Sequence, residues 1–224
     1  GNRNFHSKDA RQGSYGIKGT DIIQICSARK RTDKKIKKMK IGIFGGSFDP
    51  VHNGHIEIAK KALRQLKLDI LYFVPAFSPP HKTRKLMDAV YRKRMLRLAV
   101  KNISKFKISD FESKRKKKIY TYQTLKYFHK EYPSAKLYFV IGSDSARDLK
   151  NWKNVKEIMR LSKIVSAERE GYKTKIKKDF LKLEGIIADI SSTDARDKIK
   201  KGFSIKGLVP TVIEKYIKKN GLYK

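Results

Sequence analysis

The sequence predicts an α/β fold of the Rossmann-like, doubly wound type, with a mainly parallel sheet in a single domain and helices at its C-terminus. Three observations support this prediction. Short runs of β-branched and aromatic residues recur along the chain, segments with helical spacing of apolar residues lie between them, and no unit of about 20 to 50 residues repeats. Strands that alternate with helices form βαβ units, which build a parallel sheet covered on both faces. Ligands of such sheets bind beyond the carboxyl ends of the strands.

The expected strands are short runs bounded by polar or turn residues. They are KIGIF (40–44), ILYFVPA (70–76), FKISDFE (106–112), KLYFVIGSD (136–144), KIVSAER (163–169) and IIADI (186–190). Helices are expected where apolar residues share one face, as do Ile56, Ala59, Leu63 and Leu66, then Tyr91, Met95, Leu98 and Ala99, and then Leu125 and Phe128. Each helix falls between two of the runs, so the alternation holds along the chain.

Residues 1–39 differ from the rest of the chain. They show little apolar periodicity, and the basic run ARKRTDKKIKKMK at 28–40 covers their end. We expect a flexible basic extension or a cloning remnant here, because the scattered aspartates are unusual in a transit peptide. Met39 is then the expected natural start. The remaining residues, 40–224, are long enough for one sizeable core and form the expected folded domain.

Composition narrows the class of protein. The chain carries 55 Lys and Arg against 21 Asp and Glu, a formal charge of +34, which favours polyanions or phosphorylated small molecules as partners. An equally good interpretation is a basic surface that only keeps the fold in solution. Cys26 is the only cysteine, so no disulfide within the chain and no multi-cysteine zinc site can form. The longest apolar run, 70–77, is interrupted by Pro75 and too short to span a membrane. A soluble, cytoplasmic protein is expected.

The most specific motif is GGSFDPVHNGH at 45–55, directly after the first strand. A strand that leads through a glycine turn into a helix near His52 exposes backbone N–H groups at the carboxyl edge of the sheet, which is a ready anion site. His52 and His55 would face the same way on a helix, and Gly54 between them would leave room for a ligand. By itself such a pair also fits a plain helix surface or half of a metal site. No G-x-G-x-x-G or G-x-x-x-x-G-K-[ST] occurs, which argues against a dehydrogenase and a P-loop NTPase.

This stretch resembles the signature of the cytidylyltransferase-like nucleotidyltransferases, whose His-x-Gly-His element holds nucleoside triphosphate. Further segments follow in the order seen in bacterial nicotinate-nucleotide adenylyltransferases. They are VPAFSPPHK (74–82), YRKRMLRLAV (91–100), YTYQTL (120–125), IGSDSARDLKNW (141–152), the stretch around Arg169, ISSTDAR (190–196) and LVPTVIEKYIKKNGLY (208–223). The resemblance implies a nucleotidyltransferase domain over 40–224. It also implies transfer of the adenylyl group of ATP to nicotinic acid mononucleotide, giving deamido-NAD and pyrophosphate in NAD biosynthesis.

The local chemistry and the resemblance together indicate two sets of site residues. The residues expected to bind ATP are Gly45, Gly46, Ser47, Phe48, His52, His55, Ser192, Thr193 and Arg196. The residues expected to bind the mononucleotide are His81, Lys82, Thr121, Asp144, Trp152 and Arg169. Of these, His52, His55 and Arg196 are the expected catalytic residues.

The chemistry of these side chains suits the assigned partners. The hydroxyls of ISSTDAR can cap a helix, and the fork of Arg196 matches phosphate oxygens. Trp152 can stack on a pyridine ring, and Thr121 can cap a helix at the carboxyl edge. The resemblance places Arg169 near the nicotinate carboxylate. Each feature also has a plainer structural interpretation as a cap, a core residue or a solvated loop.

Two departures from the family pattern bear on substrate choice. Glu170 stands where the family usually has proline, and Lys153 follows the tryptophan where relatives carry an aromatic. Both leave ATP binding intact and concern the choice between acid and amide. An adenylyltransferase for nicotinamide mononucleotide therefore stays an alternative, as does, from another class, a basic nucleic-acid-binding protein. Against the latter, no zinc-finger, RNP or helix-turn-helix signature occurs.

We expect Mg²⁺ to be held with ATP by phosphate oxygens and water, because no carboxylate cluster is evident and no protein metal ligands are assigned. The expected partners are ATP and nicotinic acid mononucleotide. A membrane or a specific nucleic acid is not expected, and a homo-oligomer is possible.

Overall fold

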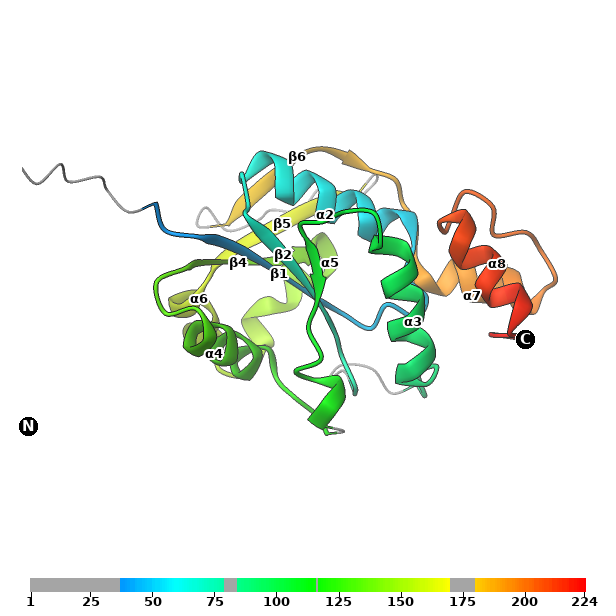
Figure 1. Ribbon diagram of the computed structural model, residues 1–224, viewed down its shortest axis with the longest axis horizontal. Helices are drawn as coiled ribbons and strands as arrows, with labels where there is room; N and C mark the ends of the chain where they lie inside the picture. The colour runs from blue at the N-terminus through cyan, green and yellow to red at the C-terminus, as the bar shows by residue number, and fades with distance from the viewer. Residues whose placement is uncertain (1–36, 79–83, 116, 170–179) are drawn as a thin grey trace, which may run out of the picture. The chain divides into compact units, whose positions relative to one another are not determined.

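The computed structural model describes residues 37–78, 84–115, 117–169 and 180–224 (Figure 1). The described strands form one parallel six-stranded sheet in the order β3-β2-β1-β4-β5-β6. Their bounds are β1 (Lys40–Gly46), β2 (Ile70–Pro75), β3 (Phe106–Ile108), β4 (Lys136–Gly142), β5 (Lys163–Arg169) and β6 (Leu181–Ile187). The Rossmann-like α/β prediction is confirmed.

Helices alternate with the strands from β1 to β5, as predicted, and two more helices follow β6. The helices are α2 (Asn53–Gln65), α3 (Ala89–Val100), α4 (Thr121–Glu131), α5 (Ser143–Asp148), α6 (Val155–Leu161), α7 (Ser192–Lys200) and α8 (Thr211–Lys219), with short 3-10 turns at Ser113–Arg115 and Leu149–Asn151. The three helices expected from apolar spacing are α2, α3 and α4. Residues Lys38–Lys224 form one compact unit, and the expected extension lies almost wholly outside the described residues.

Two strands, β3 and β6, differ from their predicted bounds by more than two residues. The last strand lies at 181–187 instead of 186–190, because LKLEGII alternates apolar and polar residues, as suits an edge strand with only one neighbour. Only Leu183 of its described side chains is buried, so a search for continuous apolar runs misses it. The third strand ends at Ile108, and the chain turns away after Ser109, whose N–H donates to Phe73 O at 2.9 Å.

The sheet has an apolar cluster on each face, as a parallel sheet requires. One cluster joins α2, α3 and α8 to the sheet, and the other joins α4 and α6 to it. Side chains of β1 alternate between them, since Ile41 and Ile43 belong to the second cluster and Phe44 to the first. β1 is therefore buried on both sides and forms a rigid base for whatever follows it.

The strand order reverses between β1 and β4. From β1 the chain crosses to β2 and β3 on one side, and from β4 it crosses to β5 and β6 on the other. The connections that leave the carboxyl ends of β1 and β4 therefore diverge, which opens a crevice at this point of an α/β sheet. Gly46 and Gly142 are the last residues of these two strands, so the site is expected between them.

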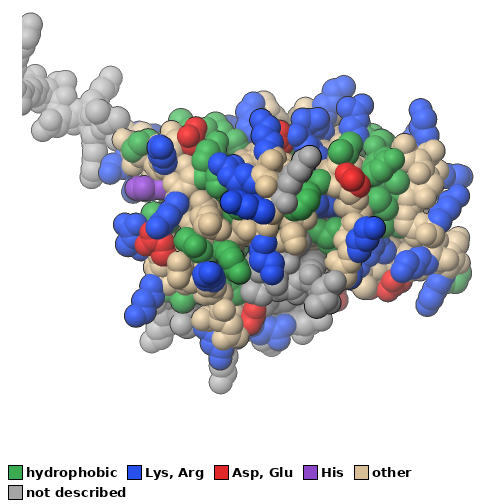
Figure 2. Space-filling view, turned by 90° about the horizontal axis from the view of Figure 1, so that it is seen from below, with side chains coloured by type: hydrophobic (Ala, Val, Ile, Leu, Met, Phe, Trp, Pro, Cys, Tyr) green, Lys and Arg blue, Asp and Glu red, His purple; other side chains and the backbone are tan. Residues whose placement is uncertain are grey.

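The face shown in Figure 2 carries its basic residues in a scattered arrangement. On the face shown in Figure 2, Lys and Arg side chains lie between apolar and neutral ones and do not gather in one stripe. This distribution does not favour a phosphate-tracking groove on that face. No helix in the described part of the chain is both long and apolar enough to cross a membrane.

Candidate active site

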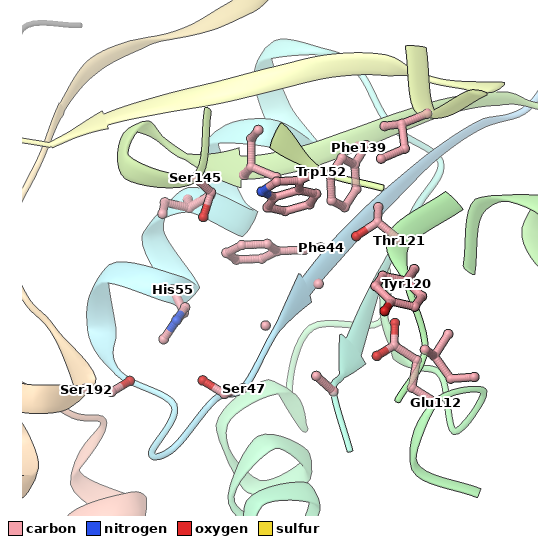
Figure 3. Close-up of a pocket in the computed structure, with 18 of the residues that line it drawn as sticks. Phe44, Ser47, His55, Glu112, Tyr120, Thr121, Phe139, Ser145, Trp152 and Ser192 are labelled. Carbon is pink, nitrogen blue, oxygen red and sulfur yellow. The ribbon is translucent and has the colours of Figure 1, made fainter. Parts of the chain in front are cut away.

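A pocket of about 370 Å³ opens at the carboxyl ends of β1 and β4 (Figure 3). Its volume falls in the range of small-molecule sites. Two kinds of residue line it. Ser47, His55 and Ser192 surround one end, and Tyr120, Thr121 and Glu112 lie at the other, with Trp152 beside Phe139 between them. We call these the hydroxyl-imidazole end and the aromatic end, and we count Trp152 and Phe139 with the aromatic end.

The hydroxyl-imidazole end joins two segments that are far apart in the chain. The turn after β1, 45–47, meets the start of α7, where Ser191 accepts from the Asp194 N–H at 3.0 Å and so caps the helix. Ser192 Oγ donates to Pro50 O at 2.9 Å, across 142 residues. The expected convergence of the glycine turn and the ISSTDAR cap is therefore present. Ser192 and Thr193 line the pocket together with Gly45, Gly46 and Ser47.

His52 and His55 form a reciprocal cap at the start of α2. His52 Nδ1 accepts from the His55 N–H, and His55 Nδ1 accepts from the His52 N–H, both at 3.3 Å. The ring centroids are 3.6 Å apart. Because each Nδ1 is an acceptor, a neutral ring at either position carries its proton on Nε2. Both side chains line the pocket, so this geometry suits donation from Nε2 to an anion.

Gly54 has a different role from the one predicted. We expected it to leave room for a ligand, but a Cβ at this position would lie 3.1 Å from His52 Nδ1 and 3.7 Å from Ile190 O. The missing side chain therefore makes room for the His52 ring. His52 is 1% exposed, and the glycine allows it to stack beneath His55.

The Phe48 side chain also lies away from the pocket. It is fully buried, and its ring is 5.0 Å from the His55 ring and 5.6 Å from the Phe44 ring. A Cβ at Gly46 would lie 3.0 Å from Phe48 Cζ, so the turn needs glycine where the ring passes. Phe48 supports His55 from the core, and any contact of Phe48 with ATP would have to use its backbone.

Asp49 is a buried anchor behind this end. Its Oδ1 accepts from Tyr223 OH at 2.8 Å, and its Oδ2 pairs with Arg84 at 2.7 Å. Its backbone carbonyl accepts from Arg196 at 2.7 Å. The same guanidinium donates to Thr193 Oγ1 at 3.0 Å. Burial, and next the nearby Arg84, lower the pKa of Arg196. Arg196 therefore ties the start of α7 to the 45–50 loop and is not itself among the described lining residues.

Arg92 is a second anchor, and sequence reasoning missed it. It is 1% exposed and donates to three carbonyls, Met87 O at 2.8 Å, Ser47 O at 2.7 Å and Ala76 O at 2.8 Å. Burial lowers the pKa of Arg92, with the charge of Asp49 acting in the opposite direction. Arg92 lies three and four residues before Met95 and Leu96, which are fully buried on α3. This helical spacing could have predicted from the sequence that Arg92 is on the core face.

At the aromatic end, Trp152 packs edge-on against Phe139, with ring centroids 6.1 Å apart and planes at 63°. Thr121 lines the pocket but is not the cap of α4. The cap is Tyr120, one residue earlier, whose N–H donates to Gln123 Oε1 at 2.9 Å. Thr121 is thus the first residue of the helix, with its backbone at the positive helix end.

The remaining predicted residues are less fully described. Asp144 lies in the first turn of α5, directly after β4, and Arg169 is the last residue of β5. Both backbones are at the carboxyl edge of the sheet, and their side chains lie outside the described part. His81, Lys82 and Glu170 also lie outside the described residues.

Glu112 is a lining residue that the sequence did not single out, because it fell at the end of an expected strand. It is buried, and its Oε1 accepts from Thr124 Oγ1 at 2.7 Å. Burial raises the pKa of Glu112 to about 7, and the Thr124 hydrogen bond opposes the shift. At neutral pH the aromatic end therefore holds a carboxyl group near its midpoint of ionisation.

This raised pKa makes stability depend on pH. A carboxyl whose folded pKa is about 7, against 4.5 for the ordinary group, stabilises the fold fully below pH 4.5 and loses that effect as pH rises through 7. We expect the free energy of unfolding to fall by up to about 3 kcal/mol over this window from Glu112. Urea unfolding at pH 5 and pH 8 measures the fall. Glu112→Gln should remove it, whereas Glu131→Gln at the exposed end of α4 should not; equal pH dependence in both variants would contradict the assignment.

The described residues include no group of three His, Cys, Asp or Glu side chains that is close enough to hold a metal ion.

The chain was also compared with known proteins. A model of the cytidylyltransferase-like family matches residues 43–198. A protein of Clostridium tetani named "Probable nicotinate-nucleotide adenylyltransferase" is 43% identical over 198 residues, covering 83% of this chain and 99% of that one. One of the same name from Clostridium novyi is 41% identical with the same coverage.

Solved structures show the same relationship. The chain is similar to Plasmodium falciparum nicotinic acid mononucleotide adenylyltransferase complexed with NaAD, with a TM-score of 0.71 and 25% identity, covering 83% of this chain and 97% of that one. The structure of that protein complexed with APC gives a TM-score of 0.70.

Proposed function

The chain belongs to the cytidylyltransferase-like family, and from this premise we propose how its pocket binds and aligns two substrates. The enzyme is a nicotinate-nucleotide adenylyltransferase of NAD biosynthesis. It transfers the adenylyl group of ATP to nicotinic acid mononucleotide and releases pyrophosphate and deamido-NAD. The similarity favours this activity over nicotinamide mononucleotide transfer and over nucleic-acid binding.

The reaction needs alignment more than acid–base chemistry. A phosphate oxygen of nicotinic acid mononucleotide, already charged near neutral pH, forms a bond to the α-phosphorus of ATP. The bond from that phosphorus to the bridging oxygen breaks, and pyrophosphate leaves. Because the nucleophile carries its own charge, no general base and no enzyme nucleophile are required. The rate must come from positioning and from stabilisation of charge on the leaving group.

The hydroxyl-imidazole end is the proposed triphosphate site. Its support is the meeting of the turn at 45–47, the Nε2 atoms of His52 and His55, and the start of α7 at one end of one pocket. Nε2–H groups aimed at the α- and β-phosphates would stabilise the charge that moves onto pyrophosphate. Arg196 supplies positive charge behind Thr193, and direct contact with phosphate would require it to give up its Thr193 hydrogen bond.

The aromatic end is the proposed mononucleotide site. Trp152 and Tyr120 offer ring faces for the pyridine, and the start of α4 at Thr121 offers positive helix-end charge. For His81, Lys82, Asp144 and Arg169, contacts with the mononucleotide stay a proposal from the sequence alone.

Mg²⁺ is the expected cofactor. The described residues provide no carboxylate cluster for it, so phosphate oxygens and water would be its ligands, which suits an ion that loses its waters reluctantly. When bound, it would offset phosphate charge. A cytoplasmic location and a homo-oligomer stay predictions from the sequence.

The main support for this function is that one pocket contains both ends. One assay tests the function. We expect pyrophosphate release when the protein is mixed with ATP, Mg²⁺ and nicotinic acid mononucleotide, and slower release with nicotinamide mononucleotide. Release is followed with a coupled phosphate assay, and deamido-NAD is identified by mass. The control omits the mononucleotide. Absence of product from both mononucleotides would refute the function.

A further inference from the structure

The aromatic end contains one basic side chain, Lys153, to which the proposed reaction gives no role. Among the described residues that line the pocket, Lys153 is the only Lys or Arg, and Glu112 is the only Asp or Glu. Lys153 directly follows Trp152, the proposed stacking residue. Its Nζ lies 4.7 Å from the centroid of the Tyr120 ring. The ammonium group is thus held between the Trp152 loop and the start of α4.

The contacts of Lys153 leave its charge available. The side chain is exposed at the pocket rim, and within the described residues no Asp or Glu side chain forms an ion pair with it. A cation over a tyrosine ring is oriented by the ring without losing its charge. Lys153 is therefore held over the Tyr120 ring in the pocket that Trp152 also lines.

The two candidate mononucleotides differ at one group on the pyridine ring. Nicotinic acid mononucleotide carries a carboxylate on the pyridine ring, where nicotinamide mononucleotide carries a neutral amide of almost the same shape. Ring stacking, ribose contacts and phosphate contacts are common to both and cannot discriminate. A fixed positive charge near the ring substituent can, because specificity is a difference between two affinities.

We propose that Lys153 sets the preference of the enzyme for the acid mononucleotide, by placing its ammonium group beside the pyridine carboxylate. The proposal rests on the proposed function and deepens it. The partial positive charge at the start of α4 acts in the same direction. Arg169, to which the resemblance gave this role, has no described side chain, so the case for Lys153 stands on its own contacts.

The test compares the two substrates in matched variants. We would measure kcat/KM for each mononucleotide at saturating ATP in the wild type, Lys153→Gln, Lys153→Arg and Lys153→Glu. The ratio of the acid value to the amide value should fall roughly fivefold to tenfold in Lys153→Gln, the scale of an ion pair at a partly exposed site. It should be kept in Lys153→Arg and fall further in Lys153→Glu, with the value for the amide nearly unchanged in Lys153→Gln.

Lys150→Gln is the matched control, because Lys150 is exposed three residues earlier and does not line the pocket. If Lys153 binds the mononucleotide phosphate, its replacement would lower kcat/KM equally for both substrates. If its role is purely structural, the replacement would leave the ratio of the two kcat/KM values unchanged. Either result, with an active wild type, overturns the proposal for Lys153 alone. A wild type that forms no deamido-NAD overturns the proposed function instead.

Discussion

Replacing His55 with alanine is expected to lower turnover by about tenfold to a thousandfold while the fold is kept, the range for removal of one preorganised donor. The ring offers Nε2 to the pocket because its Nδ1 is occupied by the His52 N–H. Its loss also removes half of the reciprocal cap, which should cost stability by only about 1 kcal/mol. The measurements are kcat, KM for ATP and the thermal unfolding midpoint.

Two further variants separate the donor from the cap. His55→Asn keeps an acceptor for the cap and an amide donor, so it should recover part of the rate lost in His55→Ala. His129→Ala changes an exposed histidine on α4 and should behave as the wild type. Full activity in His55→Ala would show that the imidazole has no part in charge stabilisation.

The second large effect is on folding. Arg92→Met should destabilise the protein by about 3 to 5 kcal/mol, because it strands the carbonyls of Met87, Ser47 and Ala76 in the interior, and each buried unsatisfied group costs about 1 to 3 kcal/mol before water enters. KM for ATP should also rise, since the Ser47 carbonyl fixes the turn after β1. Urea unfolding measures the first effect and steady-state kinetics the second.

Arg94→Met is the matched comparison, because Arg94 lies on the same helix with its side chain exposed. It should change the free energy of unfolding by less than about 0.5 kcal/mol. If the Arg92 and Arg94 variants unfold alike, the three hydrogen bonds do not stabilise the fold as we infer.

The sequence predicts the sheet well where strands are buried on both faces. KIGIF and KLYFVIG carry continuous apolar runs because helices cover both sides of β1 and β4. It fails at β6, where an edge strand alternates polar and apolar residues. It also misplaces the cap of α4 by one residue, because tyrosine is an unusual cap and Thr121 next to it is a usual one.

Prediction of the site follows the same division. Residues in a contiguous motif, such as His52 and His55, are visible because their spacing and the glycine turn lie together. Arg92, Glu112 and Asp49 are not, since burial and partners from distant segments create their roles. The roles of Phe48 and Gly54 depend on the position of a neighbouring histidine ring, and residue spacing in the sequence does not give that position.

The Tyr223–Asp49 hydrogen bond joins segments that are synthesised at different times. Asp49 belongs to the first β–α unit, yet its phenol donor follows 174 residues later. During translation the early segments leave the ribosome first and can begin to fold, but this hydrogen bond cannot form until residue 223 has been synthesised. In a nascent chain halted before residue 223, the Asp49 carboxylate therefore lacks one of its hydrogen-bond donors.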